Sequence, residues 1–452
     1  MPTAFEGFIN VARRLRGDFF DPHRPIMAAR APGWVDLLGG AAAPAGALAL
    51  GWPLGVIACV AAQADPEPRI VVRDEAGGSA TLPLNDLVDD EGAPRPYARV
   101  SALLAGRPPH QRLVGAAWLA LMREEFVRFP GGARLLVRPH AGPGATISLL
   151  AATAQALVAL AGARLAPREL GLTCQTALQR VVQPDDPHSA LGPLVSVCAP
   201  ANALLLLHPQ PAWIWGHLHL PPGTAIWAAR VGEGPGPGAP AFTRVATAMA
   251  YRLAADAEDL TPADADARWQ GYLANIGPDR FERHLRDLLP ASVRGRTFRA
   301  RYGPLPGLAL DPTQSYPVRA SAALAVDEHL RGRLALALLR AAASKDQRED
   351  DLMLVGELMV RSHWAQRAAG HGDAHADQLV GRVYGTGLAR GLYGARAAAA
   401  ESGATVVVLG RAEAEGALRS IVERYAAEVN LPVTLYGGSA SGCGVAGSRQ
   451  VT

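Results

Sequence analysis

The stretch Ala31-Pro32-Gly33-Trp34-Val35-Asp36-Leu37-Leu38-Gly39-Gly40 constrains the fold more than any other part of the sequence. It continues an apolar run that begins at Ile26, so its proline and glycine end a predicted strand in a tight turn. Glycine at such a turn lets the backbone come close to a small ligand. The three alanines that follow, at positions 41–43, offer no polar side chain to a ligand. We therefore expect a turn of the ligand-binding kind that carries few polar groups.

Two domains are expected, because 452 residues are too many for one compact core. Short apolar runs alternate with turn signals in the first half, which predicts strands and a hairpin of 69–73 with 79–82. Helices dominate after the glycine- and proline-rich segment 232–238, the strongest breaker in the chain. We place the junction there, which divides this α/β chain into domains 1–235 and 236–452.

The composition excludes several classes of function. The net charge of +3 is small and the basic residues are scattered, so no nucleic-acid partner is expected. The apolar segments 46–60 and 147–161 are too short to span a membrane, and the N-terminus lacks the pattern of a signal peptide. The four cysteines lie far apart, which speaks against a zinc site or a disulfide framework. These features predict a cytoplasmic protein without a membrane partner.

Two further stretches have the form of binding motifs. Pro139-His140-Ala141-Gly142-Pro143-Gly144-Ala145-Thr146-Ile147-Ser148 is a glycine loop that leads into a predicted helix. Free backbone N–H groups and the helix dipole attract phosphate at such a place. Within this loop, the family resemblance described below implies Gly142, Gly144, Thr146 and Ser148, or fewer of them, as nucleotide-binding candidates. A plain strand-to-helix turn is the alternative interpretation. The other stretch is Cys174-Gln175, followed by Gly192-Pro193-Leu194-Val195-Ser196.

In order and spacing, these three stretches resemble the GHMP kinase superfamily, and within it the arabinokinases and galactokinases. The arabinokinase version of the first stretch reads A-P-G-R-L-D-V-M-G-G-I-A-D-Y-S-G, which Asp36, Gly39, Gly40 and Gly46 match. The resemblance extends from Ala29 to the end of the chain, without the additional N-terminal domain of the plant enzymes. It implies a two-domain α/β (α+β) fold with a ribosomal-S5-domain-2-like N-terminal domain and a ferredoxin-like C-terminal domain.

The side chains that perform the chemistry of the family are replaced. Trp34 stands in the position of an arginine that helps to stabilise charge during phosphoryl transfer, and Ala43 replaces a sugar-binding aspartate. Gly192 stands where the family has its catalytic aspartate. Losing a general base typically lowers the rate by about 10²–10⁴-fold. The glycine-rich third motif of the family corresponds to residues 398–404, where Glu401 would repel an anion.

These losses favour a catalytically degenerate sugar-kinase-like protein, a pseudokinase that binds a sugar, a nucleotide or a protein partner. The alternative is an active ATP-dependent sugar kinase that uses ATP and Mg²⁺ to phosphorylate a monosaccharide hydroxyl. It would need a displaced acid, for which Asp186 and Asp36 are the candidates. The substrate-binding candidates are Trp34, Asp36, Gly39 and Gly40. Trp34 either fills the vacated pocket, which we favour, or stacks on a sugar or base.

Two other clusters carry hypotheses of their own. His371 and His375 would share one helix face and could ligate a metal, although a capped helix with surface histidines explains them more simply. Alternation along 213–219 puts Trp213, Trp215 and two histidines on one strand face. A solvated sheet face is the favoured interpretation of that pattern.

Overall fold

The computed structural model describes residues 3–184, 190–232, 239–344, 348–398 and 404–452. The chain forms two compact units that are not consecutive segments. Unit 1 comprises residues 1–34, 52–203 and 438–452, and unit 2 comprises 35–51 and 204–437. The expected domains 1–235 and 236–452 differ from these units, because unit 2 takes 35–51 from the first half and unit 1 takes the C-terminal residues. Most of the breaker segment, 233–238, lies outside the described residues.

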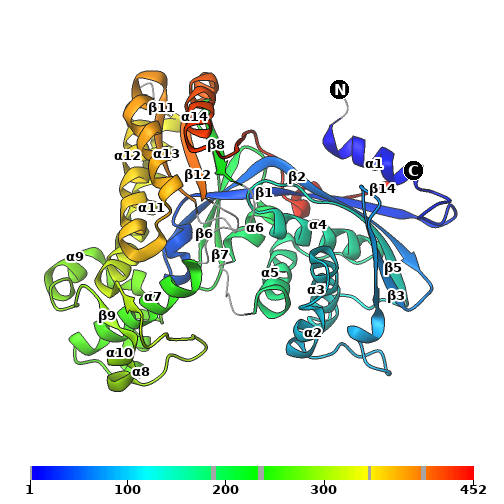
Figure 1. Cartoon of the computed structure of the whole chain (residues 1–452), viewed down its shortest axis with the longest axis horizontal. Coiled ribbons are helices and arrows are strands. Elements are labelled where there is room, and N and C mark those ends of the chain that lie inside the picture. The colour runs from blue at the N-terminus through cyan, green and yellow to red at the C-terminus, as the bar shows by residue number, and fades with distance from the viewer. Residues whose placement is uncertain (1–2, 185–189, 233–238, 345–347, 399–403) are drawn as a thin grey trace. The chain divides into compact units, whose positions relative to one another are not determined.

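Unit 1 is built on one sheet whose strands run in the order β14-β1-β2-β5-β3-β4 (Figure 1). Its strands are β1 (Ile26–Leu38), β2 (Ala49–Asp65), β3 (Arg69–Asp74), β4 (Ser79–Pro83), β5 (Gly132–Arg138) and β14 (Ser448–Val451). The predicted hairpin is confirmed, because Arg69 pairs with Pro83 and Arg73 with Ser79 across β3 and β4. Strand β14 brings the C-terminus back to the start of β1, where Val451 pairs with Ile26.

Helices cover both faces of this sheet (Figure 1). One face carries α1 (Ala4–Arg14), whose Phe8, Ile9 and Ala12 are buried with Cys59, Leu136 and other residues of the strands. The other face carries α2 (Tyr97–Leu104), α3 (Pro109–Arg123), α4 (Ala145–Leu160), α5 (Pro167–Ala177) and α6 (Leu191–Cys198). Helix α4 is apolar on nearly all sides because α3, α5 and α6 surround it. In the described part of the chain, no helix is both long and apolar enough to cross a membrane.

Unit 2 contains a four-stranded antiparallel sheet in the order β11-β12-β8-β13. The strands are β8 (Thr224–Val231), β11 (Leu392–Ala397), β12 (Ala404–Arg411) and β13 (Val433–Tyr436). Helices precede β11 and β13 in the sequence, so the unit has the β-α-β-β-α-β connectivity of a ferredoxin-like domain. Helices α13 (Ala374–Gly387) and α14 (Glu415–Val429) bury Leu379, Leu418 and Tyr425 against the sheet. The expected ferredoxin-like C-terminal domain is thus confirmed.

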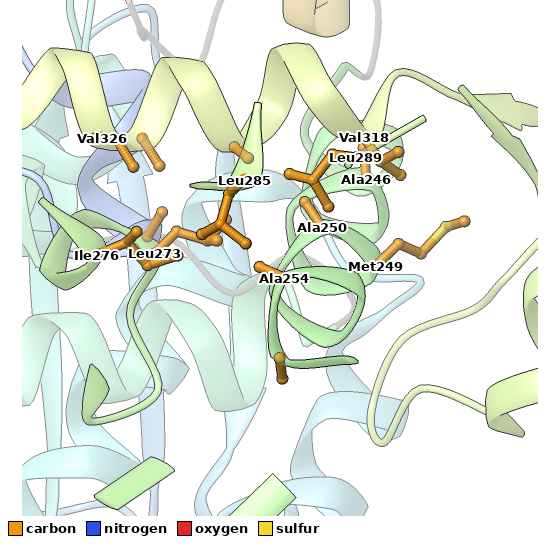
Figure 2. Close-up of a cluster of buried hydrophobic side chains, with 14 of the residues drawn as sticks. Ala246, Met249, Ala250, Ala254, Leu273, Ile276, Leu285, Leu289, Val318 and Val326 are labelled. Atoms are coloured by element: carbon orange, nitrogen blue, oxygen red, sulfur yellow. The ribbon is translucent and has the colours of Figure 1, made fainter. Parts of the chain in front are cut away.

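The rest of unit 2 is largely helical. Two strands, β6 (Ala203–His208) and β7 (Trp213–His219), pair with each other, and β6 also pairs with residues 49–51 of β2. The longer helices are α7 (Ala239–Ala257), α8 (Pro262–Trp269), α10 (Gly295–Tyr302), α11 (Val318–Ser344) and α12 (Arg348–Gln366). Figure 2 shows the core that α7 and α11 share, in which Ala250, Leu285 and Val326 are buried. A second helical layer thereby stands beside the four-stranded sheet within unit 2.

Candidate functional site

Trp34 lies in unit 1 against two glycines, Gly144 of the glycine loop and Gly192, to whose position the family resemblance assigns an acid. The side chain is 5% exposed. A Cβ atom at Gly144 would lie 2.2 Å from the indole Cδ1, and one at Gly192 would lie 2.6 Å from Cε2 and 2.7 Å from Cζ2. All three distances are far shorter than the separation of carbon atoms in van der Waals contact. The indole therefore occupies the space that a side chain at position 192 would need.

The glycine loop before α4 is held by its own histidine. The Gly142 N–H donates to Nδ1 of His140 at 3.0 Å, so the proton of a neutral His140 is on Nε2. Nε2 lies 2.7 Å from Oγ of Ser148, which in turn donates to the carbonyl of Ala145 at 3.0 Å. Two of the four nucleotide-binding candidates, Gly142 and Ser148, thus use their polar groups inside the loop.

The start of α4 keeps part of the character of an anion site. Gly144 is the N-cap residue, in the left-handed conformation with φ 75°, and no side chain caps the helix. Thr146 lies half-buried in the first turn. Helix N-termini of this kind attract anions through their free N–H groups. However, the indole of Trp34 covers Gly144, and Pro143 has no N–H to donate, so the loop does not have the open form of a phosphate cradle.

Asp36, Gly39 and Gly40 lie in unit 2, where Asp36 is engaged in a buried ion pair. Asp36 and Arg396 are both 0% exposed, and Nη1 of Arg396 contacts the carboxylate and also donates to the Asp36 carbonyl at 3.1 Å. The Gly40 N–H donates to Oδ2 of Asp36 at 3.0 Å. A Cβ at Gly40 would lie 2.4 Å from that carboxylate, which explains the glycine. The Asp36 carboxylate is therefore part of the structure of the turn at Gly39-Gly40. The turn expected at Pro32-Gly33 is wrong, because β1 continues through these residues to Leu38.

A second buried acid, Glu328 of α11, holds the other glycine of the turn. Its Oε1 accepts from the Gly39 N–H at 3.0 Å and from Oγ of Ser362 at 2.6 Å, while Oε2 pairs with Arg331 at 2.8 Å. Sequence analysis did not select Glu328, Ser362 or Arg396 as site residues. Each lies in a segment that resembles the arabinokinases in order and spacing, and that resemblance was the available signal.

The two histidines of the metal hypothesis do not share a helix face. His371 ends the π-helical turn 367–371, whereas α13 begins at Ala374 after its N-cap residue Asp373. Nδ1 of His375 lies 2.9 Å from the hydroxyl of Tyr425. No group of three His, Cys, Asp or Glu side chains is arranged to hold a metal ion within the described ranges. A capped helix begins in this segment as expected, with Asp373 as its cap, but the two histidines are half-buried and are not on the surface.

Burial lowers the pKa of His371 from 6.5 to about 4. The positive charge of Arg396 lowers this pKa further, whereas the negative charge of Glu328 raises it. Burial likewise lowers the pKa of His363, although Asp377 opposes this shift. Both residues belong to unit 2 and are neutral near pH 7. They add no positive charge to the network around Arg396.

The remaining predicted residues are placed as follows. Asp186 and Glu401 lie outside the described residues. Trp213, Trp215, His217 and His219 are exposed on one face of β7, as the alternation predicts, and Trp215 stacks on His208. The nucleotide-binding candidates and Trp34 belong to unit 1, whereas Asp36, Gly39 and Gly40 belong to unit 2.

If the Asp36 carboxylate has a structural role, removing its partner Arg396 as well should restore part of the stability that is lost when Asp36 is replaced. We expect Asp36→Ala to lower the free energy of unfolding by about 3–5 kcal/mol, because Arg396 would remain buried without a counter-charge. The double variant Asp36→Ala with Arg396→Met should be more stable than Asp36→Ala alone. Urea unfolding measures both, and equal stability of the two variants would contradict a structural pair.

The lowered pKa of His371 predicts an acid-sensitive fold. Between pH 6.5 and about 4 the unfolded chain binds a proton at His371 that the folded chain does not. The free energy of unfolding should therefore fall as pH decreases through this window, and His371→Gln should make the fall shallower. Urea titrations at several pH values test this, with His23→Gln, at an exposed histidine, as the control variant.

Comparison with known proteins agrees with this architecture. No family model matches the chain. The chain is 27% identical to an L-arabinokinase of Arabidopsis thaliana over 97% of its own length, and it spans about half (48%) of that relative. The solved structure of Lactococcus lactis galactokinase in complex with galactose superimposes with a TM-score of 0.71 at 15% identity, over 99% of this chain and 100% of that one.

A mevalonate kinase of L. major, in complex with R-mevalonate, superimposes with a TM-score of 0.52 at 14% identity, over 92% of this chain and 96% of that one. These structures share the fold, and the sequence similarity to the arabinokinase covers nearly the whole chain. The chain therefore shares the fold of galactokinase and mevalonate kinase, and over nearly its whole length it is similar in sequence to an L-arabinokinase.

Proposed function

We propose that this sugar-kinase-like protein has lost phosphoryl transfer and acts by binding a ligand or a protein partner. The observation that carries the proposal is the position of Trp34, whose buried indole fills the space next to Gly192. The family resemblance assigns the catalytic aspartate to position 192. A carboxylate there would overlap the indole and Ile147, whose Cδ1 lies 2.6 Å from a Cβ built on Gly192. By this assignment, the chain lacks both the general base and the space that its side chain would occupy.

The polar groups close to this position support the same conclusion. Ser196, one turn further along α6, donates its hydroxyl proton to the carbonyl of Pro32 at 3.0 Å. Among the described residues, the buried indole Nε1 of Trp34 has no hydrogen-bond partner, so Trp34 presents an apolar surface where the family resemblance places an arginine. Phosphoryl transfer depends on positioned charge, and this part of unit 1 supplies none from Trp34, Gly192 or Ser196.

The binding role that we propose is directed at a nucleotide or a small sugar, or at a protein partner. The uncapped N-terminus of α4 still favours an anion, which supports a nucleotide as the first ligand to test. ATP and Mg²⁺ would then bind without turnover. The loop does not have the form of an open phosphate cradle, so we expect ATP to bind more weakly than in an active kinase.

The competing proposal is an active ATP-dependent sugar kinase with a displaced acid. Asp36 is a poor candidate for that acid because Arg396 and the Gly40 N–H already engage its carboxylate. Asp186, which lies outside the described residues, is the other candidate. The alternative therefore depends on Asp186, and substitution of that residue tests it directly.

An ADP-release assay distinguishes the two proposals. With Mg²⁺, ATP and a panel of monosaccharides, we expect no sugar-dependent ADP release from the full chain, while Lactococcus lactis galactokinase serves as the active control. Sugar-dependent release that Asp186→Asn abolishes would establish the kinase instead. Thermal unfolding with and without ATP·Mg²⁺ measures binding separately, because a ligand at about 100 times its Kd stabilises the fold by about 2.7 kcal/mol.

A double-mutant cycle at positions 34 and 192 tests whether the indole fills the space beside Gly192. Gly192→Asp should lower the free energy of unfolding by about 1–3 kcal/mol because it overfills the space beside Trp34. In the Trp34→Ala background the same substitution should be markedly less harmful, with a coupling of about 1 kcal/mol or more. Gly7→Asp is the matched control, since Gly7 is also helical and has open space around it. Additive effects at 34 and 192 would contradict the filled pocket.

A further inference from the structure

Helices α11 and α12 of unit 2 expose an apolar face that the fold leaves uncovered. Leu330 and Leu334 on α11 are 39% and 45% exposed, and Leu354 and Trp364 on α12 are 52% and 46% exposed. A groove of about 470 Å³ runs along this face, lined by Asp327, Leu330, Arg331, Leu334, Leu358, Arg361 and Trp364. Contiguous exposed apolar surface of this kind usually marks an interaction site.

The charges on α12 are arranged so that this face is complementary to itself. Asp351, Leu354, Leu358 and Arg361 follow one another at spacings of three, four and three residues, so they lie along one side of the helix. Asp351 and Arg361 are each five positions from Gly356, on opposite sides of it. The row therefore reads acid, leucine, leucine, base. An antiparallel copy of the same helix presents the opposite charge at each end.

These two charged groups are available for such a contact. In the part of the chain that the structure describes, neither Asp351 nor Arg361 has an ion-pair partner, whereas Arg331 in the same groove is paired with Glu328 and Asp327. Arg361 is exposed and Asp351 is half-buried. Gly356 faces inward, where a Cβ would lie 2.0 Å from the carbonyl oxygen of Tyr393. The row of Asp351 to Arg361 thus lies on the side of α12 away from β11.

We propose that the α11–α12 face binds the same face of a second copy of this chain, about a twofold axis at the level of Gly356. Antiparallel α12 helices then place Leu354 against Leu358 of the second copy and Asp351 against Arg361. Each pair occurs twice, as an isologous interface requires. Leu330 and Leu334 of α11 widen the apolar centre of the contact. Self-complementary charge favours a second copy over an unrelated helix, which would need a matching acid and base at the same separation.

Mass measurement of the full chain in solution tests the dimer. Sedimentation velocity should give twice the 47.3 kDa of one chain at about 100 µM, with dissociation on dilution. Leu354→Glu should reduce the mass to that of one chain while thermal unfolding stays unchanged. Leu288→Glu, at a 63% exposed leucine outside this face, is the matched control and should remain dimeric. A wild-type mass of one chain at the highest concentration would overturn the proposal.

Charge reversal tests the register. Arg361→Asp alone puts two acids together, and Asp351→Arg alone puts two bases together, so each should weaken the dimer about tenfold or more. An equal mixture of the two single variants should form a heterodimer, because every acid then meets a base. The double variant D351R/R361D should again form a homodimer. A mixture that stays monomeric while the wild type dimerises would overturn the antiparallel register.

Discussion

The ion pair of Asp36 and Arg396 is the interaction on which much of unit 2 depends. The two residues are 360 positions apart in the sequence, and both are without solvent contact. A buried charge is tolerated only with a partner and further hydrogen bonds, which here come from the Gly40 N–H and the Asp36 carbonyl. Glu328 holds the neighbouring glycine in the same manner. The turn at Gly39-Gly40 is therefore held by two buried acids, Asp36 and Glu328.

The substitutions at positions 34 and 192 are best understood as one change in packing. By the family resemblance, a large indole stands in the place of an arginine and a glycine in the place of an aspartate. The indole occupies the space that a side chain at position 192 would need, since a Cβ at Gly192 would overlap it. Close packing disfavours restoring one of these residues alone. An aspartate at position 192 would clash with the indole, and loss of the indole would leave a void beside Gly192. This coupling is one ground for our proposal that phosphoryl transfer has been lost.

Much of the fold could be predicted from local patterns and from the family resemblance. The hairpin of 69–73 with 79–82 was predicted close to its observed bounds, and a helix was predicted after the glycine loop, where α4 begins at Ala145. The interleaving of the two units was not predicted, because it depends on which long-range pairs form. Strand β14, which joins the last residues to the start of β1, has no local signal of its own. Pairing partners across hundreds of residues leave no periodicity that a sequence window can detect.

For the candidate site too, some features could be predicted from residue types and others depend on long-range contacts. Residue types alone indicate that Trp34, Gly192 and the alanines after Gly40 depart from the family pattern that the chain resembles. Only the folded chain shows that the indole of Trp34 lies against Gly192, that Arg396 engages Asp36, and that His371 and His375 belong to different helices. The physical reason is that burial, charge pairing and steric overlap are properties of neighbours in space, which the order of residues along the chain does not specify.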